Sequence, residues 1–335
     1  MVQEVNNKLH ELITLAKHIP EKHIGKAIKA LQEIKSQIYD ETPNPNCRHC
    51  GSELIVKNGL KDGKQRFLCK VCGKTYGKTT GTVMYHSHSS ETTWKQVIED
   101  TVNGISIDET AESLNLTHYT VFNMLHKILL SLETDELRHP NILSGVCEAD
   151  ETYILESYKG TKFDENFWRK PRKHGATAQK PGISSEYICI CTATSRDGGA
   201  IAESVNRAKP TSKDINYVFG KKLAPCTLVI CDGAKSYDVL EKSGVCSVLH
   251  LPIGEDVKGS FYNINTTNRF HSFIKERYRS ARGFATNYLN RYNVLFCNTF
   301  KSDKFLVNDI FSKLMDGNFR FNSISDIKTL RLLSL

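Results

Sequence analysis

The sequence predicts a multidomain protein of the mixed α/β class. Two Cys-x-x-Cys pairs in the first quarter of the chain indicate a small metal-bound module, and a stretch of helical periodicity follows them. Beyond residue 140, apolar runs typical of buried strands alternate with helical patterns, and two of these runs carry aspartates. A chain of 335 residues is long enough for two or three domains.

Composition narrows the class of protein. The formal net charge of +8 suits a polyanionic partner such as DNA, although an excess of this size is common among proteins. No run of about eighteen apolar residues appears, and the first residues lack the basic and apolar regions of a signal peptide. We therefore expect a cytoplasmic, nucleoid-associated protein without a membrane span. The 11 cysteines, of which only four are tightly spaced, favour reduced thiols and one metal site over disulfides.

Residues 1–40 are predicted to form a helical N-terminal arm. Apolar side chains recur there at helical spacing, and the pattern is interrupted at Pro20. Such an arm packs on a neighbouring element or mediates self-association, so we expect a homo-oligomer. The segment from Asp40 to Asn46 contains two prolines and ends the pattern, so a new module begins there.

Residues 41–82 are predicted to form a zinc ribbon. Two Cys-x-x-Cys pairs separated by eighteen residues can place four thiolates around Zn²⁺, and the segment between them resembles a hairpin that turns at Asp62-Gly63. Four cysteines leave no open coordination position, so this zinc is expected to be structural. Basic side chains on the ribbon are candidates for DNA contact, although such charges are more often only solvated. The expected zinc ligands are Cys47, Cys50, Cys69 and Cys72.

Residues 88–132 are predicted to form a helix-turn-helix domain. An amphipathic helix runs from Ser90 to Gly104, a short helix begins after Ser106, and a third helix begins after Thr117. The alternative is an ordinary three-helix packing unit. The third helix would turn inward its apolar residues Val121, Leu125, Ile128 and Leu129. It would present to the DNA major groove the side chains of His118, Tyr119, Thr120, Asn123 and His126.

Residues 140–300 are predicted to form the catalytic domain, after a linker at 132–145. The strand-like stretch from Gly145 to Ile154 contains Glu148, Asp150 and Glu151, with Asp150 on the same face as Glu148. A second apolar run ends in Asp232. Two such aspartates on adjacent strands would repel each other unless hard cations such as Mg²⁺ or Mn²⁺ lay between them. Phosphoryl transfer is the chemistry that this arrangement indicates.

The remaining elements of this domain follow the order of an RNase H-like fold. Between the two aspartates lie strand patterns at 186–193 and 200–205 and a helical pattern at 212–223, and a further strand is expected at 245–250. In that order the two aspartates lie on the first and fourth strands, which are neighbours. The loop after the first strand is basic with interleaved aromatic residues, and we expect it to contact DNA; the alternative is a disordered basic loop. Its candidate DNA ligands are Arg172 and Lys173.

A helix predicted at 263–279 supplies the last candidates. Asn268 and Lys275 are seven residues apart, so they share one helix face to within about 20°. The neutral carbonyl of Asn268 is a weaker ligand than a carboxylate but still coordinates a hard cation. Glu276 lies about 80° round the helix and is a candidate substitute.

These motifs together resemble a known family. The order of zinc ribbon, helix-turn-helix, "EADETY", "VICDGAKSY", "NINTTNRFHSFIKERYRSARG" and "YLNRYNVLFCN" is similar to the bacterial insertion-sequence transposases of the group numbered fifteen-ninety-five. The likeness covers roughly residues 45–300 and leaves 301–335 as a C-terminal extension. It implies an integrase-like domain that uses Mg²⁺. By motif match its catalytic set is Asp150, Asp232, Asn268 and Lys275, the third position varying in the family between Glu, Asn and His.

The function expected from this resemblance is that of a transposase. It would bind the inverted-repeat ends of an insertion sequence and catalyse DNA cleavage and strand transfer into target DNA. Asp150 would bridge two ions, Asp232 and Asn268 would each complete one, and Lys275 would hold a flanking phosphate. The family often has Val-Asn-Gly-Ile-Glu where this chain has Ile264-Asn-Thr-Thr-Asn268. The alternatives are a DNA-binding regulator with an inactive RNase H-like domain and a structure-specific nuclease of the same fold.

Overall fold

A computed structural model describes Pro20 and residues 46–61, 64–160, 177–251, 261–300 and 306–315. The chain divides into two compact units, Met1–Lys78 and Thr79–Leu335, which are described separately. The predicted N-terminal arm, the hairpin turn at Asp62-Gly63 and most of the basic loop lie outside the described residues. Within the described part, no helix combines the length and the apolar character needed to cross a membrane.

The first unit contains a three-stranded antiparallel sheet in the order β1-β2-β3. Its strands are β1 (Ile55–Lys61), β2 (Lys64–Cys69) and β3 (Thr75–Gly77). The first two form the hairpin that the sequence predicts between the cysteine pairs. Among the described residues of this unit, the buried apolar core contains Cys47, Ile55, Cys69 and Tyr76, with the ring of Phe67 stacked on Tyr76 at 5.6 Å. Within the described part, two of these four core residues are cysteines of the Cys-x-x-Cys pairs, so a metal bound by them would add to the stability of the sheet.

The second unit begins with three helices, α3 (Glu91–Asn103), α4 (Ile107–Ser113) and α5 (His118–Arg138). The predicted N-caps Ser106 and Thr117 are confirmed, and Ser90 caps α3. The side chains of Ser90, Ser106 and Thr117 each accept a hydrogen bond from the backbone N–H three residues later. Gly104 ends α3 with φ of 77°, a left-handed conformation that glycine adopts without steric cost. The four residues predicted to face inward on α5 are all buried.

Helix α5 is longer than the sequence suggests. A linker was expected from residue 132, but the helix continues to Arg138, two residues before Pro140. Its acidic residues, which resemble a linker in the sequence, form ion pairs instead. Glu133 accepts a hydrogen bond from Arg291 Nε at 2.9 Å, and Asp135 lies 3.3 Å from Lys313 Nζ. The partners lie on α9 (Leu289–Thr299) and α10 (Leu306–Met315), so α5 is part of the packed helices of this unit.

Helix α10 falls in the segment treated as a C-terminal extension. It packs against α3 and α5. Its residues Ile310, Phe311 and Leu314 are buried in the same apolar cluster as Trp94 of α3. The ammonium of Lys95 also lies 4.8 Å from the centre of the Phe311 ring. Residues 306–315 therefore belong to the hydrophobic core of the helical part of this unit.

A five-stranded sheet in the order β6-β5-β4-β7-β8 forms the rest of the unit. Strands β4, β5 and β6 are antiparallel, whereas β7 is parallel to β4 and β8 is parallel to β7. The predicted order of three antiparallel strands followed by helix, strand, helix, strand and helix is found. The strands are β4 (Val146–Leu155), β5 (Tyr187–Ser195), β6 (Ala200–Arg207), β7 (Leu228–Asp232) and β8 (Ser247–Leu251).

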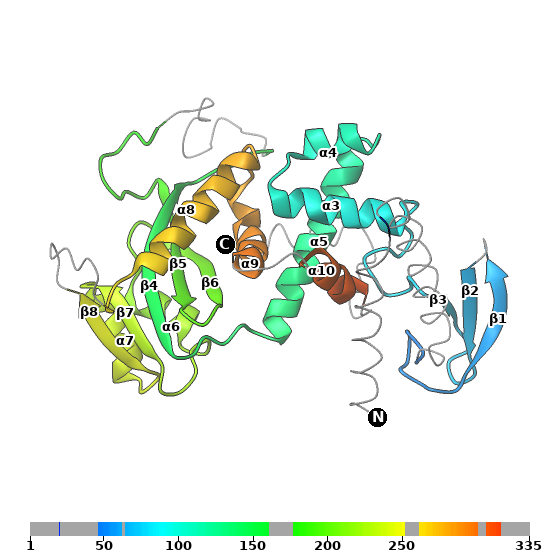
Figure 1. Cartoon of the computed structure of the whole chain (residues 1–335), viewed down its shortest axis with the longest axis horizontal. Helices are drawn as coiled ribbons and strands as arrows, with labels where there is room; N and C mark the ends of the chain where they lie inside the picture. The colour runs from blue at the N-terminus through cyan, green and yellow to red at the C-terminus, as the bar shows by residue number, and fades with distance from the viewer. Residues whose placement is uncertain are drawn as a thin grey trace, which may run out of the picture. The chain divides into compact units, whose positions relative to one another are not determined.

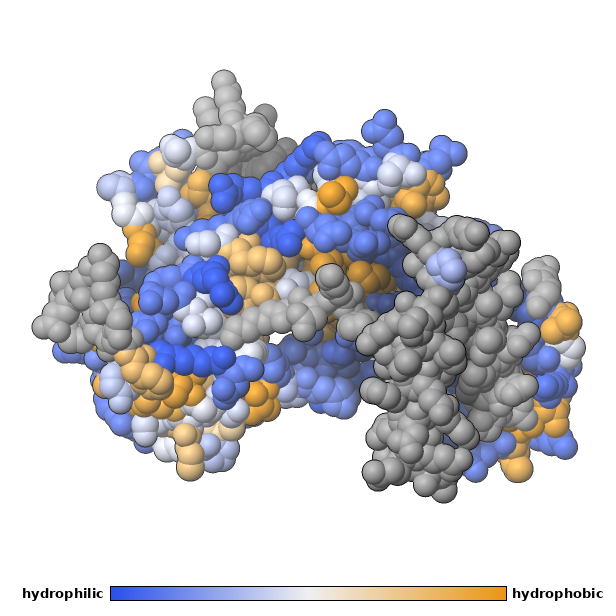
Figure 2. Space-filling view, in the orientation of Figure 1, coloured by the Kyte–Doolittle hydropathy of each residue, from blue (hydrophilic) through white to orange (hydrophobic). Residues whose placement is uncertain are grey.

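Both faces of this sheet are covered by helices. Ile188 and Ile190 of β5 belong to a cluster with α8 (Asn265–Ser280) and α9, while Cys189 and Cys191 belong to a cluster with α6 (Ser212–Phe219) and α7 (Asp238–Lys242). Short 3₁₀ turns, η1 (Lys235–Tyr237) and η2 (Thr286–Tyr288), precede α7 and α9. Figure 1 shows α8 crossing the sheet over β4 and β5. Figure 2 shows that its outer side is hydrophilic.

Candidate active site

Strands β4 and β7 bring two aspartates together. The strands pair in parallel, with Ala149 opposite Cys231, so Asp150 and Asp232 are the next residues along two neighbouring strands. Asp232 is also the last residue of β7. Carboxylate oxygens of Asp150, Glu151 and Asp232 all lie within 4.8 Å of one another. We call these three residues the acidic cluster. Asp150 and Asp232 are 82 positions apart in the sequence, and the parallel pairing of β4 with β7 places them side by side.

Burial and mutual repulsion both act on this acidic cluster. Removal from water raises the pKa of Asp150 to about 6, and the charge of Asp232 adds to the increase. Removal from water likewise raises the pKa of Glu151 to about 7, with further contributions from the charges of Asp150 and Asp232. Three neighbouring carboxylates, two of them with raised pKa values, form a ligand set suited to a hard divalent cation. The residues present therefore fit a Mg²⁺ or Mn²⁺ ion.

Asp150→Asn is expected to stabilise the protein when no divalent cation is added. A carboxyl group whose pKa is higher in the folded than in the unfolded protein lowers the free energy of unfolding. This loss is complete at pH values above the pKa in the folded protein, and it is absent at pH values below the pKa in the unfolded protein. For Asp150 that window runs from about pH 6 down to about pH 4. The variant should thus gain roughly 2–3 kcal/mol in free energy of unfolding at pH 7 and lose this advantage towards pH 4. Urea denaturation at several pH values measures the difference, and a gain independent of pH would contradict the expectation.

Glu148 has a different role from its neighbours in the motif. It is 1% exposed, and its carboxylate accepts hydrogen bonds from the backbone N–H groups of Thr266 at 2.6 Å and Thr267 at 3.1 Å. Arg196 Nε donates to the same carboxylate at 3.0 Å. The N-cap residue Ile264 has no side chain that can cap α8, and Glu148 caps the second and third residues of that helix from β4. This contact sets the position of α8 over the sheet.

Replacing Glu148 with glutamine should destabilise the second unit. The substitution removes the charge that faces both a helix N-terminus and Arg196, and its amide group meets donors rather than acceptors. We expect the free energy of unfolding to fall by roughly 2–4 kcal/mol. Urea denaturation followed by circular dichroism measures this change. Glu241→Gln, at an exposed position of α7, is the matched control, and an equal effect of both substitutions would argue against the capping role.

Helix α8 places the other predicted residues at different distances from the acidic cluster. Lys275 is exposed, and its charge lowers the pKa of Asp150, opposing the larger effect of burial. Asn268 is also exposed, and among the described residues its side chain forms no hydrogen bond with either aspartate. Glu276 is exposed on the same helix. The carboxylate of Glu151, which directly follows Asp150 in sequence, is the third group that the structure brings to the cluster.

Sequence reasoning missed one further residue of α8. His271 is 7% exposed, and its Nδ1 lies 3.7 Å from Asp150 Oδ2. Its Nε2 lies 2.6 Å from Thr192 Oγ1. Burial, together with the charge of Lys275, lowers the pKa of this imidazole to about 4, so it is neutral at pH 7. The signal in the sequence was its spacing, three residues after Asn268 and four before Lys275.

The four cysteines of the first unit form a second candidate metal site. One sulfur atom from each of them lies within 4.8 Å of the others. The pairs Cys47–Cys72 and Cys50–Cys69 have Sγ–Sγ distances of 3.6 Å. Four thiolates arranged tetrahedrally at about 2.3 Å from a zinc ion are about 3.8 Å apart, so the observed cluster has the size that zinc requires.

The exposed end of α5 carries most of the predicted DNA-binding residues. His118 and Tyr119 are exposed, and Thr120 and Asn123 are half-buried. His118 Nδ1 lies 2.7 Å from Asp108 Oδ1 on α4. The expectation for His126 is wrong, because this residue is 1% exposed and its ring lies 4.2 Å from those of Phe122 and Tyr288. It faces η2 in the sheet-containing part of the unit, a contact that helical periodicity does not reveal.

Arg172 and Lys173, the candidate DNA ligands of the basic loop, lie outside the described residues. The two ends of that loop are described. Lys159 donates hydrogen bonds to the backbone carbonyls of Arg282 and Gly283 beyond the end of α8, at 3.1 and 2.8 Å. Glu186 accepts from the backbone N–H groups of Gln179 and Lys180. Both ends of the loop are thus held to the domain that contains the acidic cluster.

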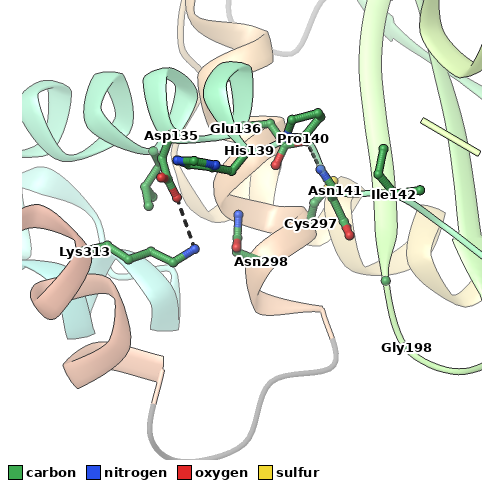
Figure 3. Close-up of a pocket in the computed structure, with 12 residues that line it drawn as sticks. Asp135, Glu136, His139, Pro140, Asn141, Ile142, Gly198, Cys297, Asn298 and Lys313 are labelled. Atoms are coloured by element: carbon green, nitrogen blue, oxygen red, sulfur yellow. Dashed lines mark hydrogen bonds and ion pairs between the residues drawn. The ribbon is translucent and has the colours of Figure 1, made fainter. Parts of the chain in front are cut away.

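A cavity of about 590 Å³ lies elsewhere in the second unit (Figure 3). The residues that line it come from the end of α5, the β5–β6 turn, α9 and α10, and they include the Asp135–Lys313 ion pair. None of the acidic cluster lines it. The cavity is therefore separate from the candidate active site.

Comparison with known proteins shows what this part of the chain resembles. The family model of the ISXO2-like transposase domain matches residues 142–296, which include every residue of the acidic cluster and α8. The chain is 24% identical over 250 residues to an uncharacterized protein in transposable element ISH50 of Halobacterium salinarum, covering 73% of this chain and 82% of that protein.

Solved structures of Mos1 assemblies are more remote. The Mos1 strand transfer complex matches with a TM-score of 0.28 and 13% identity, covering 98% of this chain and 92% of that chain. The Mos1 paired end complex with Mg matches with a TM-score of 0.29 and 14% identity, covering 92% and 90%. Likenesses at this level do not establish a shared fold. The informative matches are the other two: residues 142–296 match the family model of the ISXO2-like transposase domain, and the chain is similar to the protein in transposable element ISH50 over 250 residues.

Proposed function

We propose that this transposase binds the inverted-repeat ends of its insertion sequence and catalyses metal-dependent DNA cleavage and strand transfer. Residues 140–300 are the catalytic domain, of the RNase H-like fold, and residues 41–82 and 88–132 are the zinc ribbon and the helix-turn-helix that recognise DNA. The observation that carries the proposal is the convergence of Asp150 and Asp232 on neighbouring parallel strands within the matched transposase domain.

Asp150 and Asp232 are the carboxylates that would hold divalent ions, Mg²⁺ or Mn²⁺, and Asn268 is the proposed third ligand from α8. Glu151 lies within reach of the same ions. When bound, the ions would supply Lewis acidity that favours attack by water or a 3′-hydroxyl and stabilises the leaving oxygen. The two aspartates bring two negative charges into one small space, and the repulsion between them favours the binding of cations.

Helix α8 supplies the phosphate-binding side of the site. Arg269, Lys275 and Arg279 are exposed on it and give its outer side an excess of positive charge. Lys275 is the one whose charge reaches Asp150, so its ammonium is placed to hold a phosphate flanking the reacting strand end. Glu148 fixes this helix against β4. The fold thereby sets the distance between the basic side chains of α8 and the acidic cluster.

The exposed residues of α5 would contact the terminal repeats. Asn123→Ala should remove a side chain able to form two hydrogen bonds with a base edge, at an expected cost of about 1–3 kcal/mol in binding to the terminal repeat. Gel mobility shifts with terminal-repeat and scrambled duplexes measure both affinity and discrimination. Asn103→Ala, at the exposed end of α3, is the control. Equal losses on the two duplexes would assign Asn123 to backbone contact rather than sequence recognition.

A strand-transfer assay with the element's own ends tests the whole proposal. The full-length protein is incubated with labelled terminal-repeat duplex, a target plasmid and Mg²⁺ or Mn²⁺. Joined products that require the cation are the expected result. Cleavage without joining would identify a structure-specific nuclease, and specific binding without cleavage would identify a DNA-binding regulator, so either result would overturn the proposal.

A further inference from the structure

We propose that His271 provides a nitrogen ligand, its Nδ1, to the divalent ion held by Asp150, and that the site consequently prefers Mn²⁺ to Mg²⁺. This inference rests on the proposed metal site. It starts from the position of His271, which is buried on the inner side of α8 with one ring nitrogen directed at Asp150 and the other at β5.

The hydrogen bonds around Thr192 determine which ring nitrogen carries the proton. The Thr192 hydroxyl lies 2.7 Å from the backbone carbonyl oxygen of Asp150, and a carbonyl oxygen only accepts, so the hydroxyl donates its one proton there. The same hydroxyl oxygen lies 2.6 Å from His271 Nε2. Since the hydroxyl proton is already used, Nε2 must be the donor in this contact. A neutral His271 therefore carries its proton on Nε2 and has a lone pair on Nδ1.

The lone pair on His271 Nδ1 faces an oxygen atom of the Asp150 carboxylate. Nδ1 is 3.7 Å from Asp150 Oδ2, which is too long for a direct hydrogen bond. Two atoms that share one ion, each at about 2.1–2.2 Å, lie up to about 4.3 Å apart, so one cation can bind both His271 and Asp150. A metal-binding histidine also characteristically donates its other ring N–H to a neighbouring acceptor, which here is Thr192.

Thr192 links the backbone of Asp150 to the ring of His271. Its hydroxyl contacts both, and Thr192 is 0% exposed, so the two candidate ligands are held in a fixed relation before any metal arrives. Mg²⁺ binds almost exclusively oxygen atoms. Mn²⁺ also favours oxygen but, as a transition metal, accepts one imidazole nitrogen among its ligands more readily than Mg²⁺ does. A nitrogen ligand beside the carboxylates should therefore shift the preference of this site towards Mn²⁺.

Pulsed electron paramagnetic resonance on the Mn²⁺-loaded, zinc-containing full chain tests the inference without any measurement of DNA cleavage. The wild-type protein should show the nuclear modulation of a coordinated ¹⁴N. Protein grown with ¹⁵N-labelled histidine should lose this modulation and show that of ¹⁵N. His271→Gln should retain Mn²⁺ with an affinity about tenfold or more lower and without the nitrogen coupling, while its Mg²⁺ affinity changes less. His139→Gln, at an exposed position after α5, should behave as wild type.

The outcomes separate this inference from the proposed function. Mn²⁺ binding that requires Asp150 but lacks any nitrogen coupling in the wild-type protein would overturn the role of His271 and leave the carboxylate site standing. Mn²⁺ binding unaffected by Asp150→Asn would overturn both. The isotope substitution uses the wild-type chain, so the result does not depend on whether His271→Gln folds.

Discussion

Asp150→Asn and Asp232→Asn should each reduce cleavage of a labelled terminal-repeat duplex by roughly a thousandfold or more while leaving its binding intact. Each substitution replaces a charged metal ligand with a neutral amide of nearly the same shape, so the fold and the DNA-binding surfaces are preserved. Their carboxylates meet within the acidic cluster, and neither can substitute for the other there. Gel-based cleavage with Mg²⁺, together with mobility shifts on the same duplex, measures the two properties separately.

Asp309→Asn is the matched control for these variants. Asp309 is exposed in the first turn of α10, away from the acidic cluster, and this substitution should leave both cleavage and binding unchanged. Retained cleavage by Asp150→Asn or Asp232→Asn would refute the catalytic assignment. Loss of binding along with cleavage would show instead that the aspartates support the fold.

The second large effect is expected at the proposed zinc ribbon. Cys47→Ser removes one of four clustered thiols, and the apolar core around the three strands, as far as residues 46–61 and 64–78 show it, is small. Zinc binding contributes about 10–16 kcal/mol to the folding of comparable peptides, so its loss should unfold the ribbon. Binding to the terminal repeats should then weaken by about tenfold or more, equivalent to roughly 1.4 kcal/mol. Zinc content by elemental analysis and affinity by fluorescence anisotropy are the two measurements.

Cys226→Ser is the control that distinguishes the loss of a zinc ligand from the loss of a cysteine elsewhere in the chain. Cys226 is an exposed cysteine just before β7, outside the ribbon, and its replacement should change neither zinc content nor affinity. Chelation of the zinc from the wild-type chain should reproduce the Cys47→Ser phenotype. If repeat binding survived chelation unchanged, the ribbon would have no part in recognising the ends.

Features set by short stretches of sequence were predicted well. The caps at Ser90, Ser106 and Thr117 are local hydrogen bonds, so the helix starts that they mark are found where expected. The strands ending near Asp232 and containing Asp150 were recognisable from their apolar runs, and the element order predicted that these strands are neighbours. The cysteine spacing likewise indicated a cluster that the structure contains.

Predictions that depended on distant contacts were less successful. The acidic residues around Glu133 suggest a linker, but they lie on a continued helix because Arg291 and Lys313 pair with them from distant segments. His126 has polar character, yet the rings of Phe122 and Tyr288 bury it. In each case a local pattern was outweighed by packing against an element far away in the chain.

Residue order alone indicated most helix starts, the strands that contain Asp150 and Asp232, and the cysteine cluster, because caps, periodicity and short spacings are properties of neighbouring residues. Only the tertiary structure shows what each carboxylate of the motif at 148–151 contacts. Glu148 caps α8, Asp150 and Glu151 meet Asp232, and His271 faces Asp150, since parallel pairing of β4 with β7 and the docking of α8 bring these groups within hydrogen-bonding or metal-binding distance. Such distances depend on the packing of strands and helices from separate parts of the chain, which periodicity does not encode.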